Sequence, residues 1–246
     1  MSFDIGHEHR DVNGGWLRPT VFGGMDGLLS NSSLLAGILG AQRAAQTAHD
    51  TGAHNALVMA GIAGLLAGAF SMAVGEWISV ATQTESMMAE IETERLELER
   101  NPEGELRELA HIWETRGLSP ELAHQVAVAL SPDSETTLVN HVKEELGLHP
   151  EDLPNPWVAG ISSLLSFAVG AAIPLIPFLF RQDEHSTTVA LQQLIGLTGV
   201  TLFAAGAIVS RFTNRSWIFN GLRQLIVGGT AGTLTYLIGS LVGGSI

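Results

Sequence analysis

Long stretches without charge alternate in this chain with one strongly acidic segment, and this alternation limits what the chain can fold into. A helix needs about 20 consecutive, mostly apolar residues to cross a bilayer. Five stretches are long enough: Arg18 to Arg43, Asn55 to Glu76, Trp157 to Phe180, Ser186 to Ser210, and Trp217 onward. The sequence therefore predicts an all-α membrane protein with five transmembrane helices.

The composition agrees with a membrane protein and limits which side chains could bind a metal and which partners the chain could bind. The chain contains 28 Gly, a residue that lets transmembrane helices approach closely. It contains no Cys, so a bound metal must use carboxylate, imidazole, thioether or backbone oxygen. The net charge of -13 argues against nucleic acid as a partner and suits a cation. The polar start, residues 1–18, predicts no cleavable signal peptide.

The acidic segment lies between the second and third apolar stretches. Residues 83–153 hold 17 Asp/Glu and 5 Lys/Arg. We expect helices at about 83–100, continuing out of the second span, and at 103–116, 120–130 and 133–146. Ser119 and Ser131, each followed by Pro, are expected N-caps, and Gly117 is an expected C-cap. The predicted domains are 1–82 with spans one and two, 83–155 as a small helical metal-binding domain, and 156–246 with spans three to five.

Orientation follows from the distribution of Arg, because short cytoplasmic loops carry an excess of positive charge. With the N-terminus inside, the inner segments carry Arg10, Arg18, Arg211, Arg215 and Arg223, and the outer loops carry only Arg43 and Arg181. The acidic domain is then cytoplasmic.

Three residues in the apolar stretches are candidates for a transport path. Asp26 is a carboxylate inside the first span, where a charge is costly and indicates function. Met72 and Glu76 lie one helical turn apart in the second span, and a thioether with a carboxylate suits a borderline cation such as Fe²⁺. The alternatives are that Asp26 caps a helix at the membrane edge, that Met72 fills the core, and that Glu76 reaches the interface.

The acidic segment holds a second set of candidates. Like charges on one helix face repel each other. A cation bound between two such faces would offset the repulsion. The alternative is an acidic surface that faces solvent and binds no ion. Two Glu-x-x-His pairs, Glu108 with His111 and Glu121 with His124, permit a di-iron site in principle, but the expected helices are short for such a bundle. The candidate metal ligands in this segment are Glu90, Glu94 and Glu97 on one helix face, Glu105 and Glu108 on the next helix, and His141, Glu144 and Glu145 at its end.

Three motifs together resemble the vacuolar iron transporter family, including its nodulin-like and bacterial members. They are Asp26-Gly27-Leu28 with the polar residues after it, the run from Gly68 to Val80, and Glu145-Leu146-Gly147-Leu148 before the third span. The resemblance covers the chain from about residue 10 to its end.

The resemblance implies five transmembrane helices, a homodimer with the ion path near the subunit interface, and exchange of cytosolic Fe²⁺ for protons. It assigns Asp26 and Met72 to the path and Glu94, Glu97, Glu105, Glu108 and Glu145 to the cytoplasmic domain. The chain departs from the plant and yeast type at Gly64, where that type carries an acidic residue. It also has His141 and Val142 in place of a Met pair. These departures leave the choice between Fe²⁺ and Mn²⁺ open.

These observations predict a proton-coupled exporter of divalent metal with no permanent cofactor and no enzymatic activity. Asp26 would alternate between a metal-bound and a protonated state. The alternatives are a membrane-anchored iron sensor or ferroxidase, and a passive cation channel. The compact loops favour a bacterial inner membrane, or a vacuolar membrane if the protein is eukaryotic.

Overall fold

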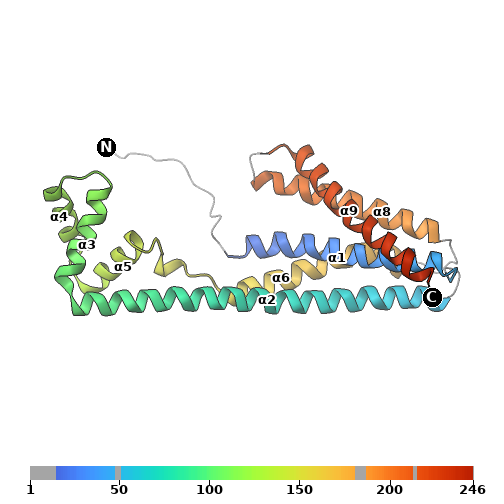
Figure 1. Cartoon of the computed structure of the whole chain (residues 1–246), viewed down its shortest axis with the longest axis horizontal. Coiled ribbons are helices and arrows are strands. Elements are labelled where there is room, and N and C mark those ends of the chain that lie inside the picture. The colour runs from blue at the N-terminus through green and yellow to red at the C-terminus, as the bar shows by residue number, and fades with distance from the viewer. Residues whose placement is uncertain (1–14, 48–50, 181–186, 213–214, 246) are drawn as a thin grey trace. The chain divides into compact units, whose positions relative to one another are not determined.

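The computed structural model describes residues 15–47, 51–180, 187–212 and 215–245, and in these ranges every regular element is helical (Figure 1). Arg10, Arg181 and Ser186, which the sequence predictions used, lie outside the described residues. The α-helices are α1 (Leu17–Ala44), α2 (Thr51–Arg100), α3 (Pro102–Thr115), α4 (Pro120–Ala129), α5 (Ser134–Glu144), α6 (Pro156–Ala172), α7 (Ile176–Leu179), α8 (Thr187–Val209) and α9 (Trp217–Gly243). Short 3-10 turns cover Pro150–Asp152, Ile173–Leu175 and Ser210–Phe212.

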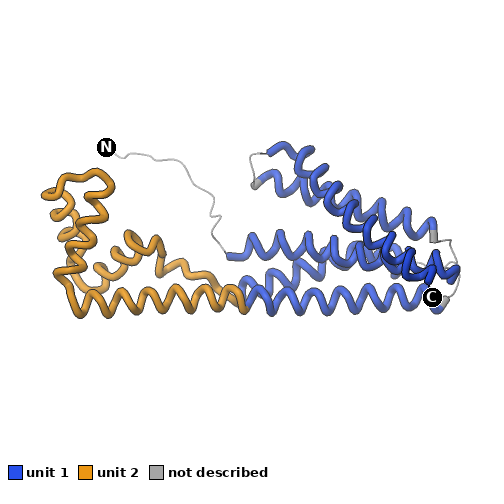
Figure 2. The backbone as a smooth tube through the Cα atoms, in the orientation of Figure 1, with its two compact units in different colours: residues 1–77, 157–246 blue, residues 78–156 orange. Residues whose placement is uncertain are grey.

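The described residues form two compact units (Figure 2). Unit 1 contains the residues up to Trp77 and those from Trp157 onward, and unit 2 is Ile78–Pro156. Helix α2 is continuous through 50 residues and contributes to both units. It would measure about 75 Å at 1.5 Å per residue, against about 30 Å for a hydrocarbon core. Only its apolar part, before Glu76, can therefore lie in a bilayer.

Four stretches of the described chain are long and apolar enough to cross a membrane. They are Gly52–Arg100, Pro150–Leu179, Thr188–Val209 and Trp217–Gly243. Helix α1 falls outside this group, so the fifth span stays a prediction. The packing of α1 explains why it is less apolar than the other four. It packs along α9 and also contacts α8 (Figure 1). Its polar residues Asn31 and Ser32 are buried. A helix that faces other helices can carry polar side chains that lower its mean hydropathy.

Glycines allow the helices of unit 1 to approach closely. A Cβ on Gly27 of α1 would overlap the backbone of α6 at Phe167, and a Cβ on Gly239 of α9 would overlap the backbone of α1 at Gly37. Helix α6 ends at Ala172, where the turn that contains Pro174 begins. A helix end is expected beside this proline, because proline lacks an N–H for the helical ladder.

Unit 2 is a small helical domain whose helix starts are set by local hydrogen bonds. Helices α3 and α4 pack on each other around Leu109, Ala110 and Ala127. The Ser119 side chain accepts from the backbone N–H of Leu122 at the start of α4, as expected. The expected cap at Ser131 is wrong. Asp133 caps α5 instead, because its carboxylate accepts hydrogen bonds from the backbone N–H groups of Glu135 and Thr136.

Candidate metal sites

A cluster of four side chains lies inside unit 2. Glu94 comes from α2, Glu105 from the first turn of α3, His141 from α5, and Glu145 directly follows α5. One ligand atom from each lies within 4.8 Å of the others. The chain itself explains the convergence: only Asn101 separates α2 from α3, and His141 and Glu145 are one helical turn apart.

The cluster is buried where charges are costly. The exposed fractions are 3% for Glu94, 7% for Glu105 and 0% for His141, while Glu145 is exposed at the edge. The Nδ1 atom of His141 lies 3.0 Å from Oε1 of Glu94 and 4.0 Å from Oε2 of Glu145. Despite these ion-pair distances, neither nitrogen of His141 nor Oε1 of Glu94 makes a well-directed hydrogen bond to any described residue. Unpaired buried polar atoms indicate a missing partner.

Burial and mutual repulsion shift the titration of these groups. Burial raises the pKa of Glu94 from 4.5 to about 7, and the charges of neighbouring carboxylates, led by Glu145, add to the increase. Burial also raises the pKa of Glu105 and of Glu145, with repulsion from Glu108 as the next cause. Burial lowers the pKa of His141, and the charge of Glu108 opposes this. Ionising all three carboxylates at neutral pH therefore calls for a compensating positive charge.

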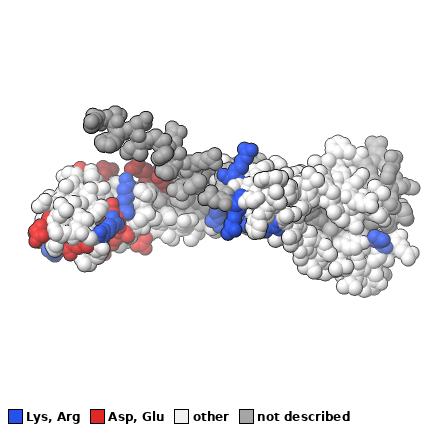
Figure 3. Space-filling model, turned by 90° about the horizontal axis from the view of Figure 1, so that it is seen from above, with Lys and Arg blue, Asp and Glu red and all other residues white. Residues whose placement is uncertain are grey.

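The donor set fits a divalent transition metal. Three carboxylates and one imidazole supply oxygen and nitrogen, which suit Fe²⁺ and Mn²⁺, and offer no sulfur. Figure 3 shows that Asp and Glu gather on unit 2, while the charged side chains visible on unit 1 are Lys and Arg. Such an acidic surface raises the local concentration of cations.

A second candidate site lies in unit 1. A cleft of about 360 Å³ is lined by Asp26 and Asn31 of α1, by Met72 of α2, and by further residues that include Ser30, Gly64 and Ser71. The Ser30 hydroxyl donates to Oδ1 of Asp26 over 2.8 Å. Carboxylate, amide, hydroxyl and thioether groups thus face one space between helices. This mixture of hard and soft donors could hold a borderline divalent cation weakly enough to release it.

Comparison with known proteins places the chain in one family. The model described as "VIT family" matches residues 17–240. The chain belongs to the VIT family. It is 33% identical over 238 residues to "Vacuolar iron transporter" of Acanthamoeba castellanii, which covers 96% of this chain and 83% of that protein. It is 29% identical over 250 residues to the protein of the same name from Toxoplasma gondii, covering 98% of this chain and 79% of that protein. It is 27% identical over 234 residues to "Vacuolar iron transporter 1" of Oryza sativa subsp. japonica, covering 94% and 88%.

The structure of this VIT-family chain brings only some of the ligands suggested by the sequence together in one cluster. Glu97 and Glu108 are exposed; they act on the cluster through their charge and lie outside the group of four. Glu144, next to Glu145, forms an ion pair with Arg116 instead. His111 of the Glu-x-x-His pairs is exposed and pairs with Glu114 at 3.6 Å. The Glu-x-x-His residues are not among the metal-type groups found in the described chain.

In unit 1, Asp26 and Met72 share the cleft, whereas Glu76 is half-buried one turn further along α2 and does not line it. Asn31 was missed as a candidate. Its signal in the sequence is an amide within a span, five residues after Asp26.

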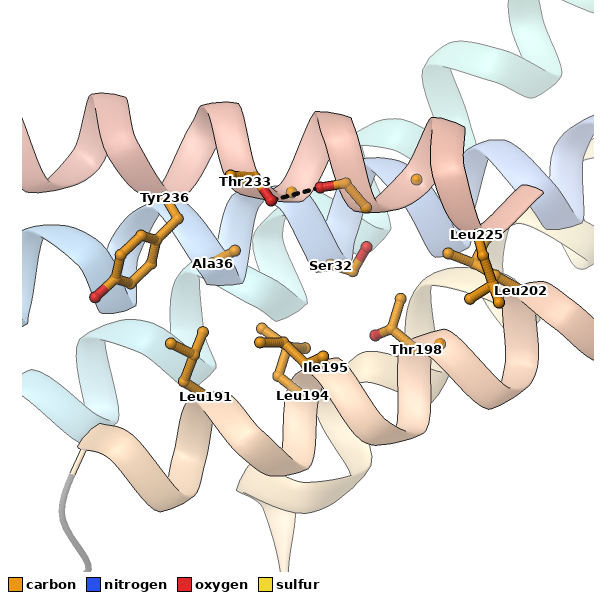
Figure 4. Close-up of a pocket in the computed structure, with 14 residues that line it drawn as sticks. Ser32, Ala36, Leu191, Leu194, Ile195, Thr198, Leu202, Leu225, Thr233 and Tyr236 are labelled. Carbon is orange, nitrogen blue, oxygen red and sulfur yellow. Dashed lines mark hydrogen bonds between the residues drawn. The ribbon is translucent and has the colours of Figure 1, made fainter. Parts of the chain in front are cut away.

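A further cavity of this VIT-family chain has a different character. It measures about 380 Å³ and lies between α1, α8 and α9 (Figure 4). Leucines and glycines dominate its lining. Its polar groups are Ser32, Thr198, Thr233 and Tyr236, and no carboxylate or imidazole is among the described residues that line it. This cavity therefore lacks the donors that a divalent cation needs.

Proposed function

We propose that this VIT-family protein carries Fe²⁺, with Mn²⁺ as a second substrate, out of the cytosol in exchange for protons. The relatives named above carry iron transport in their names. The observation that carries the proposal is the cleft that Asp26 and Met72 share between helices of unit 1. A carboxylate there can hold either a metal ion or a proton, and this alternation is the simplest chemical basis for exchange.

The cluster in unit 2 acts first in this scheme. Glu94, Glu105, His141 and Glu145 gather the metal ion at the cytoplasmic side, and exposed Glu97 and Glu108 attract it to the cluster. The ion then passes to the cleft in unit 1, with Glu76 as a further carboxylate of the path. Protons enter in the opposite direction through Asp26.

The proposed topology has five spans, which are α1 and the four apolar stretches described above. Support comes from its 28-residue length, which is enough to cross a bilayer, and from its packing along α9. The positive-inside rule then places unit 2 in the cytoplasm. The family resemblance adds a homodimer, and the compact loops favour a bacterial inner membrane.

Metal flux into proteoliposomes tests this function. Fe²⁺ and Mn²⁺ uptake would be measured with and without an imposed pH gradient for the parent, for Asp26→Asn and for Thr233→Val. The Thr233 hydroxyl bonds to its own helix at the carbonyl of Gly229 and faces the apolar cavity, so its removal is a matched control.

We expect the pH gradient to drive flux in the parent and the control, and Asp26→Asn to abolish it. Flux that ignores the gradient would identify a passive channel. Tight metal binding without flux would identify an iron sensor, and oxygen consumption on addition of Fe²⁺ would identify a ferroxidase.

A further inference from the structure

Asn31 is the most deeply buried polar residue of the unit 1 cleft. It lies in α1, is 3% exposed, and lines the cleft together with Asp26 and Met72. Its Nδ2 atom donates to the carbonyl oxygen of Ala171, near the end of α6, over 2.6 Å. Because a carbonyl oxygen can only accept a hydrogen bond, this contact fixes the orientation of the amide. The amide oxygen must point away from α6.

The Oδ1 atom of Asn31 has no hydrogen-bond partner among the described residues. On α2, Gly64 lies beside it: a Cβ on Gly64 would stand 3.3 Å from Oδ1. Since glycine has no side chain, α2 offers this oxygen no side-chain donor at that position. An amide oxygen that is buried, held in one orientation and left unpaired is costly, and in native proteins it calls for an explanation.

We propose that Oδ1 of Asn31 is a ligand of the metal ion in the cleft, beside the Asp26 carboxylate and the Met72 sulfur. The inference rests on the proposed function, since the ion is its cargo. An amide oxygen adds a hard donor without adding charge. Asp26 is then the only carboxylate among the described residues that line the cleft. The amide oxygen favours Mn²⁺ and Fe²⁺ over softer ions such as Zn²⁺.

A purely structural role for Asn31 predicts something different. In that case only the bond from Nδ2 to Ala171 matters, because it satisfies a carbonyl where α6 ends. The substitution Asn31→Asp separates the two roles. It keeps an oxygen for the metal ion but removes the donor, and it places a carboxylate against a carbonyl oxygen. Asn31→Leu removes both the oxygen and the donor at similar volume.

The test measures KM and kcat for Mn²⁺ and Zn²⁺ flux in proteoliposomes for the parent, Asn31→Asp, Asn31→Leu and Ser32→Ala. Ser32 is also buried in α1, but it faces the apolar cavity and bonds to the Leu29 carbonyl of its own helix, so its variant is the control. We expect Asn31→Leu to raise KM for Mn²⁺ at least about tenfold, and to raise KM for Zn²⁺ less. Asn31→Asp should keep or lower KM for Mn²⁺.

Equal impairment of Asn31→Asp and Asn31→Leu, with parallel effects on both ions, would overturn the ligand assignment in favour of the structural bond. Parental KM values in both variants would overturn it too. If Asn31→Leu does not fold, as judged by size exclusion, Asn31→Ala takes its place with the same expectation. A parent that passes no metal would instead refute the proposed function, and the ligand assignment with it.

Discussion

Replacing Glu94 by Gln should make unit 2 more stable at alkaline pH in the absence of metal. In the folded protein, burial and neighbouring carboxylates raise the pKa of Glu94 from 4.5 to about 7. Well below pH 4.5 the carboxyl group is protonated in the folded and the unfolded chain, so its ionisation does not affect stability there. As the pH rises towards 7, the unfolded chain loses this proton first, so the folded state becomes less stable.

The size of the effect follows from the two pKa values. At about 1.4 kcal/mol per pKa unit, the difference between 4.5 and about 7 corresponds to at most about 3.4 kcal/mol. Salt screens the part that comes from the exposed carboxylates Glu97 and Glu108, so we expect about 2–3 kcal/mol. His141 acts in the opposite direction, because burial lowers its pKa and its contribution is lost as the pH falls below 6.5. It is present in both proteins, and at pH 8 it is uncharged in the folded and the unfolded chain of each.

Hydrogen–deuterium exchange of the α5 amides measures this stability in the full-length protein with a chelator present. After correction for intrinsic exchange, protection in the parent should fall between pH 4.5 and 8 by about 30- to 160-fold more than in Glu94→Gln. Glu90→Gln is the matched control, because it removes an exposed carboxylate one turn earlier on α2. In this control, the protection of the α5 amides should change with pH as it does in the parent. A difference between parent and Glu94→Gln that stays constant over this pH range would refute the reasoning.

Three further predictions concern packing, the path and unit 2. Gly27→Ala should destabilise the detergent-solubilised protein by about 1–3 kcal/mol in thermal unfolding, because the new methyl group overlaps the α6 backbone; Gly24→Ala, which has room, should not. Met72→Leu keeps the volume but removes the sulfur, and it should lower Fe²⁺ flux into proteoliposomes about tenfold; unchanged flux would exclude a thioether ligand. Arg116→Gln removes the ion pair with Glu144, and because that pair is partly exposed it should cost unit 2 only about 1 kcal/mol in urea unfolding.

Local sequence signals predicted most of the helices of this chain. Apolar spacing placed α3, and the Ser119-Pro120 pair placed the start of α4, each to within one residue, since periodicity and caps act over a few residues. The same logic failed at Ser131, because two acceptors compete there for the N–H groups of one helix start. Asp133 is the stronger acceptor, and the Ser131 hydroxyl donates to the Ala127 carbonyl instead.

The metal cluster was only partly accessible from the sequence. Helical spacing puts Glu94 and Glu97 on one face of α2 and Glu105 and Glu108 one turn apart on α3, and the family resemblance points to both pairs. Spacing cannot tell which member of each pair is buried, because this depends on where α2, α3 and α5 cross. Asn31 shows the same limit: its role depends on a carbonyl of α6, about 140 residues away in the chain.

The central claim is that metal and protons move in opposite directions through one protein. The most direct measurement loads proteoliposomes with a pH-sensitive dye, imposes a Mn²⁺ gradient without a pH gradient, and follows the internal pH. The account predicts that inward Mn²⁺ movement drives protons out in the parent and that Asp26→Asn shows no pH change. Mn²⁺ entry in the parent without any change of internal pH would contradict it.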